Sequence, residues 1–119
     1  MKDYIQNALK TESIHFNVEG RERLLHAGIG LATESGEFLD ALKKSIFYGK
    51  DLDTINLKEE LGDVLWYLAI AMDALGTDFE TEMEKNIKKL KVRYGEKFTQ
   101  ELAENRNIEK EREILEGRG

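Results

Sequence analysis

Cysteine and proline are both absent from this sequence of 119 residues. Without cysteine, the chain can form neither a disulfide framework nor a metal site built from thiolates. The lack of cysteine is also typical of a reducing compartment, so we expect a cytoplasmic protein. Without proline, and with its glycines mostly single, the chain shows no low-complexity linker and no repeat of solenoid length. We therefore expect one domain covering residues 1–119.

Long apolar runs are missing as well. The longest uncharged apolar run, from Val64 to Met72, is far shorter than the ~20 residues that a membrane-spanning helix needs. The first ten residues, MKDYIQNALK, contain no apolar stretch of the kind found in a signal peptide. We therefore expect no membrane partner.

Positive charge is in deficit. The chain carries 18 Lys and Arg against 24 Asp and Glu, a net charge of −6, which disfavours a nucleic-acid partner. The exception is a cationic segment that holds six basic residues and one acid, at positions 85, 88, 89, 91, 93, 97 and 96. A small anion is the partner that such a local cationic segment fits.

Helical periodicity dominates what is present. Apolar residues recur at three- and four-residue intervals and strand signals are weak, so we predict an all-α bundle of four to five helices. The core of the domain is expected at about residues 21–98, and a charged C-terminal helix at about residues 99–116. The expected helices cover residues 3–10, 21–47, 56–76, 77–95 and 99–115, the last with a break near residue 105.

The third of these helices has two notable features. Asn56 and Glu59 have the spacing of a capping box, which predicts Asn56 as its N-cap. From Val64 to Leu75 the helix is apolar almost all round, so we expect other helices to surround it. One chain offers too few neighbours to cover it, and we therefore expect a homodimer or homotetramer.

Two acidic motifs of the same form lie in the second and third helices: Glu34-Ser-Gly-Glu37 and Glu60-Leu-Gly-Asp63. Residues three apart lie on one helix face, and antiparallel packing of the two helices would bring the pairs together. Four such carboxylates repel one another unless a cation binds them. Oxygen ligands suit Mg²⁺, with Mn²⁺ as a possible substitute. The four acids are therefore the candidate metal ligands.

Two alternatives stay open at this point. Acids at this spacing are also common on solvated helix faces. Glu59 could replace Glu60 as a ligand, because it lies four residues before Asp63. We favour Glu60 because it shares one face with Asp63 and Tyr67.

Glycine is the worst helix former after proline and costs about 1 kcal/mol relative to Ala. Gly36 and Gly62 occupy matched positions in the two motifs. Each points roughly away from the first acid of its motif. We expect a neighbouring backbone to approach closely at both.

The two histidines give no metal site. A di-iron bundle needs two Glu-x-x-His motifs, and this chain has one, Glu12 to His15, in a segment that we expect to be irregular. His26 lies one turn from Glu22, which could be its hydrogen-bond partner. We interpret His26 as a structural or pocket-wall residue.

Three segments together resemble a known family, the MazG-like all-α nucleoside triphosphate pyrophosphohydrolases, including compact phage-type members. They are LLHAGIGLATESGEFLDALKK, KEELGDVLWYLAIAMDALG and NIKKLKVRYGEKF, and they run from about Leu24 to Phe98. The family pattern is ExxE, a spacer and ExxD. The residues that meet it here are Glu34, Glu37, Glu60 and Asp63.

The resemblance implies hydrolysis of nucleoside or deoxynucleoside triphosphates to the monophosphate and pyrophosphate, in nucleotide-pool cleaning or control. It implies that the four acids bind Mg²⁺, that a metal-bound water is the nucleophile, and that Glu34 or Glu37 is the general base. It also implies assembly as dimers or dimers of dimers. The alternative is a non-catalytic helical oligomer that binds nucleotide or metal.

The substrate-binding candidates lie mainly on the fourth helix. Asn86, Lys89 and Arg93 share one face there, and Arg93 could grip a triphosphate with two hydrogen bonds. A solvated basic stripe is the alternative. Lys44 is a further candidate, with Lys43.

Two aromatic residues follow the second acidic motif. Tyr67 lies one turn beyond Asp63 and is expected to line the nucleotide pocket or pack in the core. Trp66 points about 100° away from it and is expected in the core or an interface.

Overall fold

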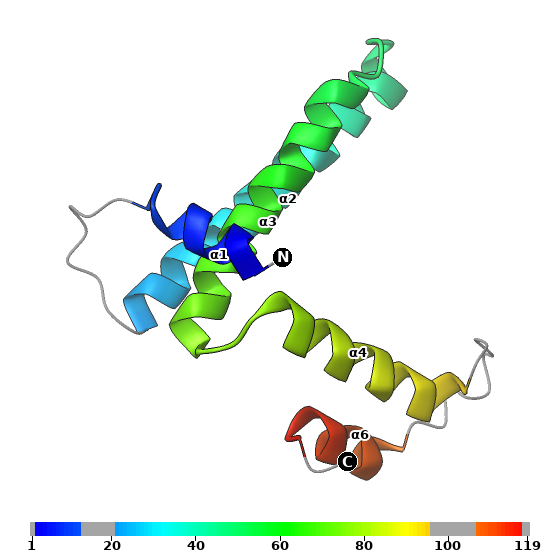
Figure 1. Cartoon of the computed structure of the whole chain (residues 1–119). Coiled ribbons are helices and arrows are strands. Elements are labelled where there is room, and N and C mark those ends of the chain that lie inside the picture. The colour runs from blue at the N-terminus through cyan, green and yellow to red at the C-terminus, as the bar shows by residue number, and fades with distance from the viewer. Residues whose placement is uncertain (1, 13–20, 96–106, 118–119) are drawn as a thin grey trace. The chain divides into compact units, whose positions relative to one another are not determined.

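The computed structural model describes residues 2–12, 21–95 and 107–117, and the chain divides into two compact units at Asp78 and Phe79. The first unit holds α1 (Lys2–Leu9), α2 (Arg21–Tyr48) and α3 (Thr54–Leu75). The second holds α4 (Phe79–Tyr94) and α6 (Ile108–Leu115). Every regular element in the described ranges is a helix (Figure 1), which confirms the all-α prediction.

An antiparallel pair of long helices dominates the first unit. Helices α2 and α3 run side by side, joined by residues 49–53 (Figure 1). Gly49 opens this connection with φ of +65°, a conformation that favours glycine. Helix α1 packs against α3. The pair therefore places the segments that carry the two acidic motifs against each other.

The two ends of α3 differ in how well the sequence predicted them. The N-cap is Asp53, whose Oδ1 accepts a hydrogen bond from the backbone N–H of Asn56 at 3.0 Å. The prediction of Asn56 as the cap was therefore wrong, because an earlier side chain already satisfies that N–H. At the other end, Gly76 has φ of +71° and ends the helix as predicted.

The core of the first unit consists mainly of small and aliphatic residues. Ala27 of α2 and both Ala69 and Ile70 of α3 are fully buried, and α1 contributes Ile5 and Ala8. Other parts of α3 are not covered in the described chain, where Leu61, Leu65 and Leu75 are 53%, 44% and 65% exposed. These exposures agree with the expectation that the described part of one chain has too few neighbours to cover this helix, and assembly with further copies stays a prediction.

Arg23 joins three segments of the first unit. Its guanidinium donates to both carboxylate oxygens of Glu12, at 3.0 and 2.9 Å, and to Asp73 at 2.7 Å. The segment after α1 is thereby tied to the start of α2 and the end of α3. Glu12, from the single Glu-x-x-His motif, is thus engaged in an ion pair, and His15 lies outside the described residues.

Close helix approach occurs at a different glycine from the expected ones. A Cβ at Gly36 or Gly62 would have no atom within 4 Å, so the predicted approach of a neighbouring backbone is wrong within the described chain. At Gly30, a Cβ would overlap the ring of Tyr67. Glycine is therefore required at position 30, where α2 receives an aromatic side chain from α3.

An ion pair organises the second unit. Arg93 of α4 donates to Glu111 of α6, with 2.9 Å between Nε and Oε1, and Glu111 is only 2% exposed. The Glu111 carboxylate raises the pKa of Arg93, with a smaller contribution from Tyr94. Gly95, with φ of +64°, follows α4 as predicted. The start of the last expected helix near residue 99 and its expected break near residue 105 lie outside the described residues.

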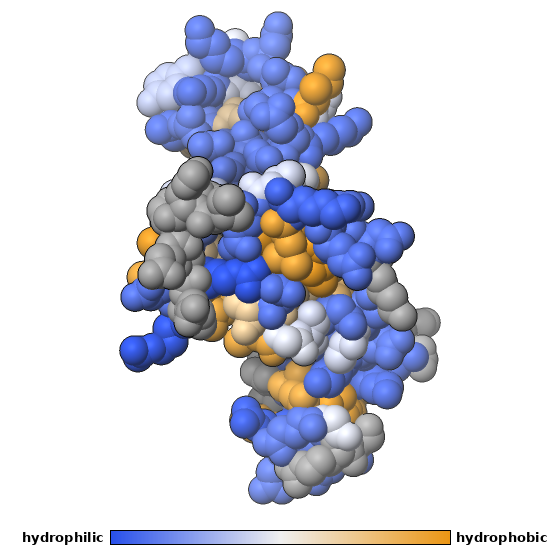
Figure 2. All heavy atoms as spheres, turned by 60° about the vertical axis from the view of Figure 1, so that its left-hand side comes forward, coloured by the Kyte–Doolittle hydropathy of each residue, from blue (hydrophilic) through white to orange (hydrophobic). Residues whose placement is uncertain are grey.

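Apolar side chains reach the surface in patches among a largely hydrophilic exterior (Figure 2). The most regular set follows α2 at alternating intervals of four and three residues. We call it the α2 stripe. It is apolar except at Lys43, and its exposed members are Leu25, Ile29, Ala32, Gly36, Leu39, Lys43 and Ile46. Across the described ranges, no helix combines the length and the hydropathy that a bilayer crossing requires.

Candidate metal centre

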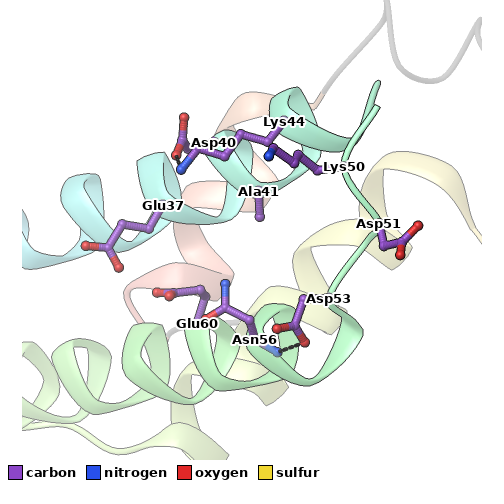
Figure 3. A pocket seen from close by; sticks show the side chains of 9 residues that line it. All are labelled: Glu37, Asp40, Ala41, Lys44, Lys50, Asp51, Asp53, Asn56 and Glu60. Carbon is purple, nitrogen blue, oxygen red and sulfur yellow. Dashed lines mark hydrogen bonds and ion pairs between the residues drawn. The ribbon is translucent and has the colours of Figure 1, made fainter. Parts of the chain in front are cut away.

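A cavity of about 330 Å³ lies between α2 and α3 near the 49–53 connection (Figure 3). We call it the loop-end cavity. Charged side chains form most of its wall, and Glu37 and Glu60 are the members furthest from the connection. The full lining is Glu37, Asp40, Ala41, Lys44, Lys50, Asp51, Asp53, Asn56 and Glu60.

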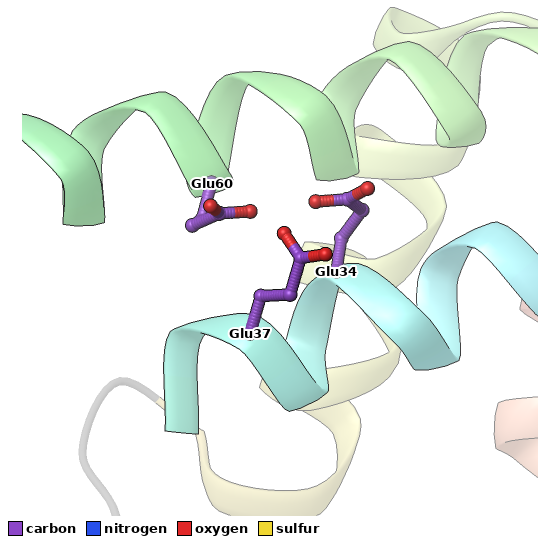
Figure 4. Close-up of side chains that lie close together, drawn as sticks. All are labelled: Glu34, Glu37 and Glu60. Carbon is purple, nitrogen blue, oxygen red and sulfur yellow. The ribbon is translucent and has the colours of Figure 1, made fainter. Parts of the chain in front are cut away.

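Three carboxylates converge where this cavity ends. Glu34 and Glu37 from α2 point toward Glu60 from α3 (Figure 4), and one oxygen of each lies within 4.8 Å of the others. Glu60 is 5% exposed, Glu34 is half-buried and Glu37 is exposed. The structure thus brings together three of the four acids that the sequence analysis selected. We call them the acid triad.

Two oxygens of the triad have no hydrogen-bond partner among the described residues. They are Oε2 of Glu34 and Oε2 of Glu60, and both are buried. Buried polar atoms in native proteins are almost always paired. Unpaired buried oxygens on two neighbouring carboxylates are atoms that a bound cation would satisfy.

The triad also perturbs the protonation of its buried member. The pKa of Glu60 is raised to about 7, first by the hydrogen bond it shares with Glu34 and then by burial and the neighbouring Glu37. Protonation is the way in which the metal-free triad relieves its own repulsion. A cation in the same place would remove the need for that proton.

The triad fits a hard divalent cation. All three donors are carboxylate oxygens, which Mg²⁺ and Mn²⁺ prefer, and no sulfur or imidazole ligand takes part in the described triad. The exposure of Glu37 leaves one side open to water and to phosphate oxygens. The donor set, the unpaired oxygens and the open side agree with one another.

Asp63, the fourth predicted ligand, lies beside the triad. It belongs to a second group of carboxylates with Glu59 and Glu60, whose oxygens also lie within 4.8 Å of one another. Glu60 is common to both groups. Between the two candidates that the sequence left open, Glu60 is buried between the helices and Glu59 is exposed.

A second cavity, of about 350 Å³, contains Glu34 and Asp63 together with two rings. We call it the aromatic cavity, and its lining is Thr11, Glu34, Asp63, Trp66 and Tyr67. The indole Nε1 of Trp66 donates to Thr11 Oγ1 at 2.7 Å. Tyr67 thus lines a cavity, and its contact with a nucleotide stays a prediction. Trp66 is half-buried and lines the same cavity, and its place in an interface stays a prediction.

Aromatic contacts fix the two rings. The Trp66 and Tyr67 rings meet edge to face with centroids 5.1 Å apart, and His26 meets Tyr67 in the same way at 6.0 Å. His26 therefore packs against a ring that forms part of the cavity wall.

Several residues near the site had no signal in the sequence. Tyr4 of α1 donates to the carbonyl of Gly62 at 3.5 Å, and burial together with the charge of Asp63 raises its pKa. Thr11 and Lys50 line the two cavities. Only the packing of α1 on α3 and the path of the 49–53 connection place these side chains, and neither follows from a local pattern.

The predicted basic residues divide between the two units. Lys44 lies in the loop-end cavity and pairs with Asp40 at 2.8 Å, and Lys43 pairs with the same carboxylate at 3.7 Å. Asn86, Lys89 and Arg93 lie on α4 in the second unit. Asn86 is exposed, Lys89 is half-buried and Arg93 is paired with Glu111. Their contact with a triphosphate stays a prediction.

Comparison with known proteins adds two findings. Residues 24–98 match the family model of the MazG nucleotide pyrophosphohydrolase domain, a segment that includes both acidic motifs and all of α4. The chain is also similar to the Gene 37 protein of Mycobacterium phage L5, with 32% identity over 92 residues, which cover 71% of this chain and 78% of that protein. No solved structure matches the chain.

Proposed function

The chain belongs to the MazG nucleotide pyrophosphohydrolase domain family, and on that premise we propose that it hydrolyses nucleoside or deoxynucleoside triphosphates to the monophosphate and pyrophosphate. The proposal includes a requirement for Mg²⁺, which Mn²⁺ can replace. The cytoplasm is the proposed location, and control or cleaning of the nucleotide pool is the proposed role.

The observation that carries this proposal is the pair of buried, unpaired carboxylate oxygens on Glu34 and Glu60. Together with Glu37 they would hold the divalent cation. When bound, such an ion lowers the pKa of a coordinated water and screens phosphate charge. Asp63, in the adjoining group, is the proposed fourth ligand.

The triad's own residues divide the remaining work. Glu60 is buried and its pKa is raised to about 7, so it would give up its remaining proton to a cation bound at the triad. Glu34 and Glu37 are the candidates for accepting the proton of the attacking water. Of these, Glu37 is exposed and lines the loop-end cavity, so water reaches it directly. Position and exposure therefore favour Glu37 as the general base.

Cationic residues complete the proposed site. Lys44 lines the loop-end cavity beside Glu37, where an ammonium can offset phosphate charge. Asn86, Lys89 and Arg93 are proposed to contact the triphosphate from α4. Tyr67 is proposed to contact the nucleotide, because it lines the aromatic cavity that Glu34 and Asp63 share.

The α2 stripe supports a homodimer or homotetramer. It has the spacing of a coiled-coil seam, alternating four and three residues, and lies on the side of α2 away from Gly30 and Glu34. Its C-terminal half forms part of a mainly apolar groove of about 570 Å³, lined by Gly36, Leu39, Asp40, Leu42, Lys43, Ile46 and Phe47. The small side chains at Ala32 and Gly36 allow a second copy of this chain to approach closely.

Release of pyrophosphate from a panel of triphosphates tests the activity. We expect release with Mg²⁺, none with EDTA, and a loss of at least about 100-fold in Glu37→Gln, as for a group used in general base catalysis. Glu59→Gln is the matched control, because Glu59 is exposed and belongs only to the second acid group. If the unaltered protein released no pyrophosphate, a binding module would be favoured instead. If Glu59→Gln lost more activity than Glu37→Gln, the result would indicate that the cation binds at the second acid group.

A further inference from the structure

The two cavities lie on opposite sides of the acid triad along the α2–α3 pair. The loop-end cavity extends from Glu37 and Glu60 toward the 49–53 connection. The aromatic cavity extends from Glu34 the other way, toward Trp66 and Tyr67. A molecule held at the triad therefore has two chemically different places for its two ends.

The loop-end cavity is lined by two lysines, Lys44 and Lys50, which differ in whether a described carboxylate forms an ion pair with them. Asp40 is paired with Lys44, and Asp53 is committed to capping α3. The Asp51 carboxylate points away from Glu37 and Glu60 (Figure 3). The ammonium of Lys50 lines the cavity and has no ion pair among the described residues.

The aromatic cavity offers fixed rings instead of cations. The indole of Trp66 is held by its hydrogen bond to Thr11 and by the edge of Tyr67. Tyr67 is held in turn against Gly30 and His26. Rings that are fixed before a ligand arrives are suited to stacking on a planar heterocycle.

We propose that the nucleotide lies along the α2–α3 pair in one direction, with its β- and γ-phosphates in the loop-end cavity at Lys50 and its base in the aromatic cavity at Trp66. This inference rests on the proposed function, because the triad must hold the phosphate that joins the two ends. It assigns Lys50 to the pyrophosphate product and Trp66, with its positioning residue Thr11, to the monophosphate product. The direction follows from where the lysines and the rings lie: the phosphate end needs a cation, and of the two cavities only the loop-end cavity is lined by lysines, whereas the planar base needs a ring, which only the aromatic cavity offers.

Product binding separates the two ends, because each product carries one of them. Inhibition constants for pyrophosphate and for the matching nucleoside monophosphate are measured with Mg²⁺, beside calorimetric binding of each product. We expect Lys50→Ala to weaken the binding of pyrophosphate about tenfold and to leave the binding of the monophosphate unchanged. Trp66→Leu is expected to weaken the binding of the monophosphate about tenfold and to leave the binding of pyrophosphate unchanged.

Two further variants control this experiment. Lys58→Ala removes an exposed lysine of α3 that lines neither cavity, and should change neither constant. Thr11→Val keeps the shape of the side chain but removes the acceptor of the indole N–H. It should weaken the binding of the monophosphate in the same way, and it provides the test if Trp66→Leu does not fold.

The outcomes distinguish this inference from the proposed function. The reverse pattern would overturn the direction, and so would an equal loss of affinity for both products in Lys50→Ala and Thr11→Val. In either case, pyrophosphate release by the unaltered protein would still support the proposed activity. If the unaltered protein released no pyrophosphate but bound both products, the calorimetric constants would still decide the direction. If the unaltered protein neither released pyrophosphate nor bound either product, both proposals would fail.

Discussion

Gly30 of α2 lies so close to Tyr67 of α3 that a methyl group at position 30 would overlap the tyrosine ring. Gly30 is itself buried. The same ring forms part of the aromatic cavity with Glu34 and Asp63. Gly30, which has no functional side chain, therefore sets the position of the Tyr67 ring beside Glu34 and Asp63.

Gly30→Ala should displace Tyr67 and lower the free energy of unfolding by about 1 to 3 kcal/mol, as overpacking does in a core. Thermal or denaturant melts measure this change, and near-ultraviolet circular dichroism reports the displaced Tyr67 and its neighbour Trp66. Gly28→Ala is the matched control on the same helix, because nothing lies within 4 Å of a Cβ there. It should stabilise the protein by up to about 1 kcal/mol through helix propensity alone. Equal effects of the two changes would contradict the contact.

The metal-free protein should lose stability as the pH rises through 7. Glu60 has its ordinary pKa of 4.5 when unfolded and about 7 when folded, so the folded chain binds this proton more tightly. Its contribution is fully present below about pH 4.5 and is lost as the pH rises through about 7. The carboxylates facing it are Glu34 and Glu37 from α2, with Glu59 and Asp63 on its own helix.

Melting curves in EDTA between about pH 5 and pH 8 test this dependence. Glu60→Gln should flatten it, since the amide does not titrate. With Mg²⁺ the sign reverses: the cation competes with the proton, so its affinity should increase as the pH rises. An unchanged slope in Glu60→Gln would show that another group is responsible.

Arg93 should have a structural role that Lys89 lacks. Either Arg93→Met or Glu111→Leu leaves a charge of the buried pair without its partner, so each should lower the melting temperature. Combining both should recover much of the loss, because two apolar residues replace the pair. Lys89→Ala should leave the melting temperature unchanged and weaken only triphosphate binding. Additive losses in the double variant would argue against a direct pair.

Ile46→Glu should dissociate the proposed oligomer into 13.7 kDa chains, as measured by light scattering. The side chain is 70% exposed in the single chain and lies on the α2 stripe. Ile108→Glu provides the matched control: that isoleucine is 68% exposed but lies on α6, outside the stripe. A monomeric unaltered protein with full activity would remove the basis for the assembly proposal.

Local patterns predicted the helices and the acids well. The three-residue spacing of Glu34 and Glu37 placed them on one face, and the short connection after α2 brought Glu60 opposite them. These relations depend on helix geometry and on antiparallel pairing alone. Their role as ligands stays a prediction.

Features that depend on how helices cross were missed. Spacing could not show that Gly30, and not Gly36 or Gly62, would meet a side chain from the other helix. The 100° between Trp66 and Tyr67 suggested different surroundings, yet the segment after α1 brings Thr11 to the indole, and one cavity contains both rings. Such relations arise from tertiary packing, which no local pattern records.

The acid triad is drawn entirely from two helices that follow each other in sequence, joined by residues 49–53. Closing so short a connection costs little chain entropy, and contacts of low sequence separation form early in folding. The triad should therefore assemble with the α2–α3 hairpin, independently of α4 and α6. A divalent cation present during synthesis would then act on the order of folding events, by relieving the repulsion that opposes closure of this hairpin.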